Sequence, residues 1–124
     1  LPDEEGCIIG PLAFLPPERV SQTPELKRRR SDIYSLGVLL YDGIVGDLPF
    51  DALDDLQLID RIEFANVPLA HEVSSQPIPP ELSEVIRQAM SKRPEQRFAT
   101  AGEFALAVLE IVTWSVRATR LPAA

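Results

Sequence analysis

Apolar residues recur around the whole circumference of one segment, residues 31–46. One stripe consists of Ile33, Leu36, Leu40 and Ile44, and a second consists of Tyr34, Val38, Tyr41 and Val45. A helix that is apolar on every side is buried in the protein interior. The pattern therefore predicts a buried central helix.

The ends of this predicted helix carry residues with capping preferences. Ser31 is a good N-cap, and Asp32 puts a negative charge in the first turn, where the helix macrodipole favours it. Gly46 can adopt the positive φ that commonly follows a helix. We expect the helix to begin after Ser31 and to end before Gly46.

Two further helices are predicted after the central one. Residues 51–66 form an amphipathic pattern typical of a surface helix, with an apolar face of Leu53, Leu56, Ile59 and Ile62. Pro79 and Pro80 open the next helix, because proline suits a first turn, and we expect Pro94 to end it. The buried face of this helix is expected to be Leu82, Val85, Ile86, Ala89 and Met90.

A last helix is predicted to begin at Thr100, which forms a capping-box pattern with Glu103. Its apolar stripe is Phe104, Val108, Ile111 and Val112. Residues 6–20 and 67–80 lack a helical period and are predicted to be irregular loops, the second containing His71. The sequence thus predicts a mainly α fold, in which about three further helices and an N-terminal irregular loop surround the central helix.

Composition excludes several classes of protein. The chain has 124 residues and a net charge of −7, so it lacks the basic excess of a nucleic-acid-binding protein. One Cys and one His form neither an internal disulfide nor a structural zinc site. No apolar run approaches the roughly 18 residues of a membrane span. We expect a reducing cytoplasm, and the lack of an initiator Met favours a chain that begins in mid-domain.

The most conspicuous local charge is the basic run at residues 27–30. Such runs usually form a solvated face. The alternative is a surface that binds carboxylates or phosphates, since guanidinium groups bind both through two parallel hydrogen bonds.

Four short motifs then follow one another along the chain. They are Pro16-Pro17-Glu18, Ser31-Asp32-Ile33-Tyr34-Ser35-Leu36-Gly37, Leu48-Pro49-Phe50 and Lys92-Arg93-Pro94-Glu95-Gln96-Arg97-Phe98. Their order and intervals resemble the large lobe (C-lobe) of bacterial, eukaryotic-like serine/threonine protein kinases, from the end of the activation segment to the last helix. The resemblance implies a partial kinase domain at residues 1–116, followed by a tail at residues 117–124.

The resemblance also implies roles for individual residues. Glu18 pairs with Arg97, and Asp32 holds the backbone of the catalytic loop. The loop that contacts the substrate maps onto Ile8, Ile9, Gly10, Pro11, Leu12 and Phe14, whose mostly apolar side chains predict a preference for an apolar residue after the phosphoacceptor. Three positions depart from the pattern: Cys7 and Pro11 replace threonines, and Arg93 replaces an aspartate.

The parts that transfer phosphate are missing from the sequence. No GxGxxG, His-Arg-Asp or Asp-Phe-Gly occurs, so we expect no catalytic, cofactor-binding or metal-binding residue on this chain. ATP and Mg would belong to the full-length kinase. The expected partners are the rest of the kinase domain, ahead of Leu1, and a protein substrate or partner protein. The alternatives are a non-catalytic, pseudokinase-like binding module and an unrelated helical adaptor.

Overall fold

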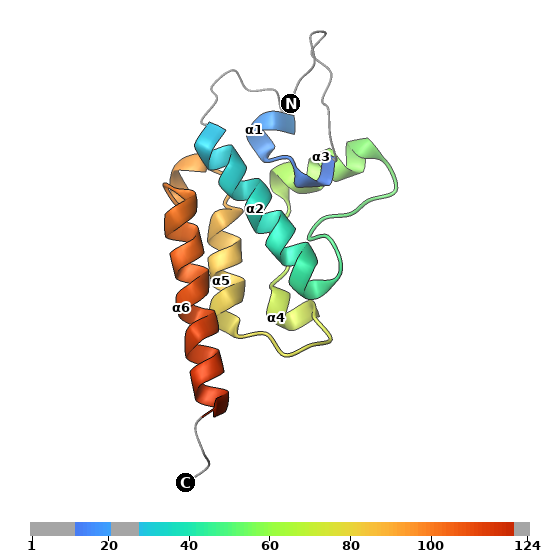
Figure 1. Cartoon of the computed structure of the whole chain (residues 1–124). Coiled ribbons are helices and arrows are strands. Elements are labelled where there is room, and N and C mark those ends of the chain that lie inside the picture. Colours follow the sequence, from blue (N-terminus) through green and yellow to red (C-terminus); the bar gives the residue numbers. More distant parts are fainter. Residues whose placement is uncertain (1–11, 21–27, 121–124) are drawn as a thin grey trace.

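The computed structural model describes residues 12–20 and 28–120, with 28, 29 and 118–120 described by their backbone alone. All regular structure in these residues is helical (Figure 1). The longer elements are α1 (Pro17–Val20), α2 (Arg28–Val45), α3 (Asp55–Phe64), α4 (Ala70–Val73), α5 (Pro80–Ala89) and α6 (Ala101–Arg120). Single 3-10 turns lie at η1 (Leu12–Phe14) and η2 (Pro94–Gln96). The prediction of a mainly α fold is confirmed.

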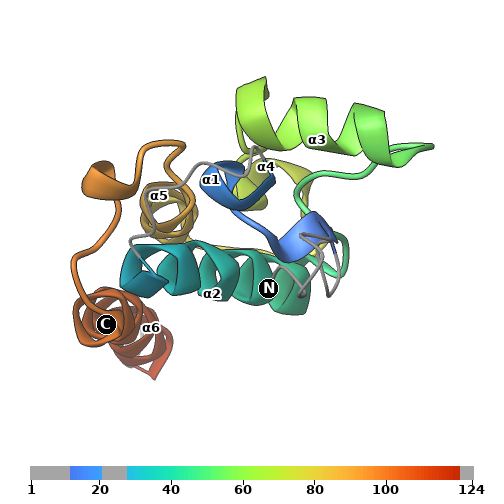
Figure 2. The same ribbon diagram turned by 90° about the horizontal axis from the view of Figure 1, so that it is seen from above.

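Helix α2 lies at the centre of the fold. It contacts α4, α5, α6, η1 and η2, and Figure 2 shows α1 and α5 on one side of it and α6 on the other. Burial of apolar side chains between these elements is the main force that stabilises the fold. The core is built from large side chains that lose all or nearly all of their exposure: Tyr34, Val38, Tyr41, Ile62, Ile86 and Met90.

The two ends of α2 differ in how well the sequence predicted them. The prediction that Ser31 is the N-cap is wrong, because α2 begins at Arg28 and the Ser31 hydroxyl donates to Glu18 Oε2 at 2.6 Å instead. The C-terminal prediction is confirmed. Gly46 has a φ of +89°, and its N–H donates to the carbonyl of Asp42 at 2.9 Å.

One stripe of α2 is exposed, so the prediction that this helix is buried on every side is wrong there. The stripe consists of Asp32, Leu36, Leu39 and Gly43, which recur at helical spacing. Leu39 retains 58% of its exposure although it lies at the middle of the central helix. The apolar residues of this stripe therefore face a region that the described residues leave open.

Helices α3 and α5 are shorter than predicted. Helix α3 starts after Asp54, whose carboxylate accepts from the Gln57 N–H at 2.9 Å. Helix α5 begins at Pro80 as predicted but ends at Ala89, where the Ser91 hydroxyl donates to the carbonyl of Gln88 at 2.8 Å. Pro94 does not end α5, and it begins η2 instead.

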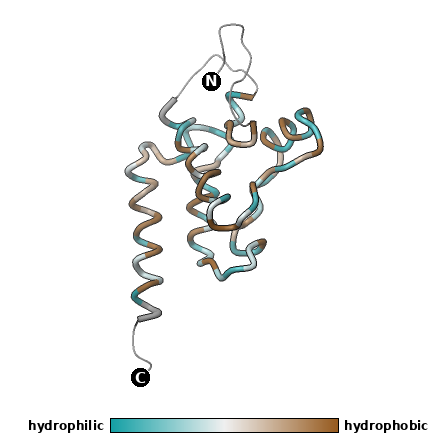
Figure 3. Tube along the Cα trace, turned by 45° about the vertical axis from the view of Figure 1, so that its right-hand side comes forward, coloured by the Kyte–Doolittle hydropathy of each residue, from teal (hydrophilic) through white to brown (hydrophobic). Residues whose placement is uncertain are grey.

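Helix α6 begins after Thr100, as the capping-box pattern predicts. The Thr100 hydroxyl accepts from the Glu103 N–H at 3.1 Å, while the Glu103 carboxylate accepts from the N–H of Ala99 at 3.2 Å and not from that of Thr100. Figure 3 shows hydrophobic positions recurring along the helix. It extends to Arg120, past the expected boundary at residues 116 and 117, and that domain boundary stays a prediction.

Both predicted loops contain helical turns. Helix α1 and η1 lie within residues 6–20, and α4 lies within residues 67–80. His71 belongs to α4, where its backbone N–H and its Nδ1 lie 2.9 and 2.8 Å from the Ser83 hydroxyl. These contacts fix α4 against α5, so His71 has a structural role.

Candidate functional site

An ion pair between Glu18 and Arg97 joins two parts of the chain that lie far apart in the sequence. Nη1 and Nη2 of Arg97 donate to the two carboxylate oxygens of Glu18 at 2.7 and 2.8 Å. Both residues are buried, with 8% and 3% of their surface exposed. This is the bidentate geometry in which guanidinium and carboxylate interact most strongly. The structure thus places together the two residues that the resemblance pairs.

The remaining donors of Arg97 bind backbone carbonyl groups. Nε donates to Ser91 at 2.8 Å, Nη1 to Arg30 at 3.0 Å, and Nη2 to Lys92 at 3.4 Å. The guanidinium also lies 4.9 Å from the centroid of the Tyr34 ring. Arg97 therefore connects α1, the start of α2 and the segment between α5 and α6.

Two opposing effects act on the Glu18 carboxyl. Burial by itself raises its pKa, but the hydrogen bonds from Arg97 and Ser31, together with the positive charge of Arg97, outweigh burial and lower the pKa below its ordinary value of 4.5. The folded protein therefore holds Glu18 in its charged form.

This shift predicts how stability depends on pH. A carboxyl whose pKa is lowered by folding stabilises the protein above its unfolded pKa, and the stabilisation is lost as pH falls through the folded value. We expect the difference in unfolding free energy between wild type and Glu18→Gln to shrink as pH is lowered from neutral to below 4.5. Urea denaturation of both proteins across this range measures the difference. A difference that is the same at every pH would contradict the charged pair.

Arg30 is a residue of this site that the sequence did not reveal. Its Nη1 lies 3.3 Å from each of the carbonyl oxygens of Pro94, Glu95 and Arg97, at the end of η2. The prediction of a solvated basic run is therefore wrong for Arg30. The other side chains of that run, at residues 27–29, lie outside the described residues.

Lys92 fixes α3 to the segment that follows α5. Its ammonium donates to the carbonyl of Ile62 at 2.7 Å, in the last turn of α3, and lies 4.5 Å from the centroid of the Phe50 ring. A cation suits this end of a helix because the exposed carbonyls carry partial negative charge. Burial, and to a lesser extent the charge of Arg97, lowers the pKa of Lys92 to about 8.

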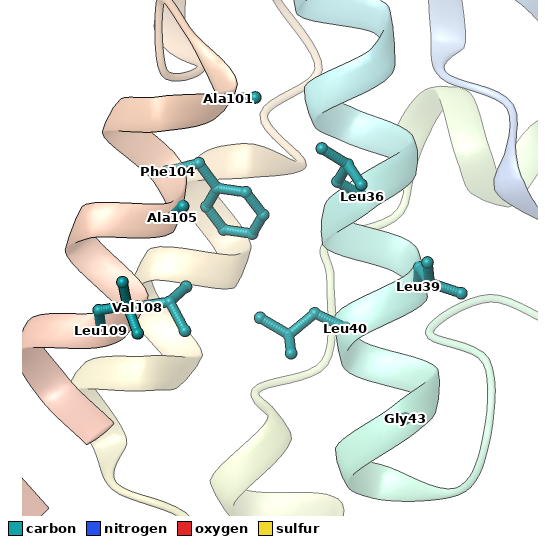
Figure 4. A pocket seen from close by; sticks show the side chains of 9 residues that line it. All are labelled: Leu36, Leu39, Leu40, Gly43, Ala101, Phe104, Ala105, Val108 and Leu109. Atoms are coloured by element: carbon teal, nitrogen blue, oxygen red, sulfur yellow. The ribbon is translucent and has the colours of Figure 1, made fainter. Parts of the chain in front are cut away.

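An apolar groove runs between α2 and α6, with a volume of about 640 Å³. Figure 4 shows side chains of both helices along it, and they include Leu36, Leu39 and Leu40 of α2 and Phe104, Val108 and Leu109 of α6. Asp32 continues the exposed stripe of α2 beyond the groove. Within the described part of the chain, its carboxylate forms no hydrogen bond or ion pair.

Comparison with known proteins decides the family. The family model for protein tyrosine and serine/threonine kinases matches residues 3–102. The chain belongs to this family. The matched residues include Glu18, Asp32 and Arg97. The resemblance to a kinase C-lobe, which the order of the four motifs indicates, is therefore confirmed.

Individual kinases show the same relationship. Over 96 residues the chain is 35% identical to the serine/threonine-protein kinase PknL of Mycobacterium tuberculosis, covering 77% of this chain and 23% of that kinase. It is 33% identical to PksC of Streptomyces coelicolor, covering 77% and 17%. It is 36% identical to the mouse serine/threonine-protein kinase N3, covering 82% and 11%. The chain spans less than a quarter of the length of these kinases.

The predicted substrate loop of the kinase is described only in part. Leu12 and Phe14 form η1 and are half-buried against the core, and the carbonyl of Phe14 accepts from the Ser35 hydroxyl at 2.7 Å. The other members of the loop, Ile8, Ile9, Gly10 and Pro11, lie outside the described residues, as does Cys7. The role of this loop stays a prediction.

No cluster of metal ligands is present in the part of the kinase domain that the structure describes. In residues 12–20 and 28–117, no three His, Cys, Asp or Glu side chains gather where they could hold a metal ion. Among the helices of the described residues, none is both long and apolar enough to cross a membrane.

Proposed function

We propose that this chain is the substrate-side, C-terminal part of a serine/threonine protein kinase domain. In the full-length kinase, phosphate would pass from ATP to Ser or Thr residues of a protein substrate. The observation that carries the proposal is the exposed stripe of α2, which begins at Asp32 and continues through Leu36 and Leu39. The family match at residues 3–102 supports the same assignment.

The exposed stripe of α2 favours a partner surface that is partly apolar and partly able to donate hydrogen bonds. Leucines that stay exposed along a groove of about 640 Å³ favour an apolar partner surface, because burying apolar area is the main source of association energy. The carboxylate of Asp32, next to them, favours backbone N–H donors. The resemblance assigns Asp32 to the catalytic loop, and we expect the same missing part of the kinase domain to cover the leucines.

The parts needed for phosphoryl transfer would therefore lie in sequence outside this chain. These are a glycine-rich loop, a lysine on the phosphates, a catalytic aspartate and the ligands of magnesium. ATP and Mg are cofactors of that larger protein, which we place in the cytoplasm. The partners of this chain are then the remainder of the kinase domain and a protein substrate.

This proposal predicts how nucleotide binding depends on the length of the polypeptide. The isolated chain is expected to show no magnesium-dependent ATP binding by calorimetric titration, because it carries none of the phosphate or metal ligands. A polypeptide that also contains the region encoded in frame ahead of Leu1 is expected to bind ATP.

A control keeps this experiment specific. The isolated chain is first shown to be helical by circular dichroism, so that lack of binding does not reflect unfolding. Micromolar, magnesium-dependent binding of ATP to the isolated chain would contradict the proposal. So would an upstream region that lacks the glycine-rich loop, His-Arg-Asp and Asp-Phe-Gly, and this second result would support the pseudokinase-like alternative.

A further inference from the structure

Lys92 is a half-buried lysine without an acidic partner. Its Nζ donates to the carbonyl of Ile62 at 2.7 Å and lies 3.5 Å from the carbonyl oxygen of Arg61. The ring of Phe50 lies on another side, with its centroid 4.5 Å from Nζ. Among the described residues, no carboxylate pairs with this ammonium. Charged side chains are rarely buried without an opposite charge, so the surroundings of Lys92 do not favour its cationic form.

These surroundings favour the neutral amine. Burial removes water from the ammonium and the positive charge of Arg97 repels it, and together they lower the pKa of Lys92 from 10.5 to about 8. At about pH 7.5, roughly a quarter of such amines are neutral, compared with about one in a thousand at the ordinary pKa. Desolvation and a neighbouring cation are the conditions that activate a lysine as a nucleophile.

The contacts of Lys92 hold the amine in place and leave its lone pair free. The carbonyl oxygens of Ile62 and Arg61 accept hydrogen bonds from Nζ, so N–H groups point toward them. In the neutral amine, the lone pair then points away from both oxygens. Lys92 keeps part of its surface exposed, so a small electrophile from solvent can reach it.

We propose that Lys92 is a site of acylation by small acyl phosphates, and that its acylation loosens the attachment of α3. Nζ attacks the acyl carbon, and a C–N amide bond forms as the C–O bond to phosphate breaks. The phosphate leaves with the electron pair of that bond and takes up the proton that Nζ loses. The product is a neutral amide. This proposal uses no residue of the α2 and α6 groove and is independent of the proposed function.

Acylation changes the charge at the C-terminal end of α3. The ammonium of Lys92 suits the partial negative charge of this helix end and is attracted to the face of the Phe50 ring. An amide has no charge and only one N–H, so it loses both attractions and cannot donate to two carbonyl groups. Helix α3 still packs on α1 and η1. We therefore expect α3 to open more often while the rest of the fold persists.

Site-resolved acetylation tests the reactivity of Lys92. The complete chain is incubated with a limiting amount of acetyl phosphate, and mass spectrometry compares Lys92 with Lys27, the other lysine of the sequence. We expect Lys92 to react at least about tenfold faster than Lys27 near neutral pH, and the two to react at equal rates in guanidinium chloride that unfolds the chain. Equal or slower reaction of Lys92 in the folded chain, or a preference for Lys92 that survives unfolding, would overturn the proposal.

Two variants test the effect on α3. Lys92→Gln removes the charge, as acetylation does, and Lys92→Arg keeps it. Amide hydrogen exchange followed by mass spectrometry is expected to be about fivefold faster in α3 of Lys92→Gln, with α5 unchanged, and close to wild type in Lys92→Arg. Arg93→Gln removes the same charge from the adjacent exposed residue and is expected to change nothing. Equal exchange in Lys92→Gln and Lys92→Arg, or equal acceleration of α3 and α5, would overturn the proposal.

Discussion

Arg97→Ala is expected to unfold most of the chain under conditions in which the wild type is folded. The substitution leaves Glu18 buried without its bidentate partner, 2.7 Å away in the wild type, and it frees three backbone carbonyls that Arg97 satisfies. Breaking a buried ion pair by removing one partner costs about 3–5 kcal/mol. A small domain has only about 5–15 kcal/mol of stability in total. Urea denaturation followed by circular dichroism measures the loss, and Glu18→Ala is expected to behave alike.

The matched control for this experiment is Arg93→Ala. Arg93 lies in the same connecting segment, is exposed, and forms no side-chain cap with η2. Exposed substitutions of this kind usually change stability by less than about 0.5 kcal/mol. Equal denaturation midpoints for Arg97→Ala and Arg93→Ala would show that the pair does not hold the fold together.

Gly37→Val is expected to destabilise the chain by about 1–3 kcal/mol through overpacking. Helices α2 and α5 approach closely at this glycine. A Cβ atom there would lie 3.0 Å from Met90 Cγ and 3.1 Å from Ala89 Cβ. Valine adds two further methyl groups at the same place, so the two helices have to separate.

The matched variant Gly43→Val isolates this effect. Gly43 lies in the same helix, and a Cβ there meets nothing within 4 Å. Both variants gain the same helix propensity, because both replace glycine by valine. Thermal and urea denaturation are expected to show a loss for Gly37→Val and little change for Gly43→Val. Equal stability of the two variants would contradict the close packing of α2 on α5.

The pattern of apolar and polar residues predicted which helices form better than it predicted where each helix begins and ends. Gly46 ends α2 as expected, because glycine lacks a Cβ and adopts a positive φ readily whatever its neighbours are. Ser31 is a different case, since its hydroxyl could cap a helix or bind Glu18, and a tertiary contact decides between them. The four residues of α4 are too few to show a helical period, which is why this helix was not predicted.

Contacts between distant segments could not be predicted from the periodic spacing of apolar residues. Leu36 and Leu39 are hydrophobic, but the sequence of α2 alone does not determine whether they are buried. Their exposure depends on which neighbouring segments are present. The contacts of Arg30 with the end of η2 span more than sixty positions, and nothing in a basic run indicates them. Glu18 and Arg97, 79 positions apart, were paired by the kinase resemblance and by no rule of spacing.

We propose that this chain is one part of a catalytic serine/threonine kinase domain and that Asp32 holds the backbone of the catalytic loop of that domain. Phosphate transfer from labelled ATP to a protein substrate tests it most directly, using the polypeptide that includes the region ahead of Leu1. We predict magnesium-dependent phosphorylation of Ser and Thr that is strongly reduced by Asp32→Asn, a variant expected to leave the stability of the isolated chain unchanged because Asp32 is exposed. ATP binding by the longer wild-type polypeptide without any phosphate transfer would contradict the account.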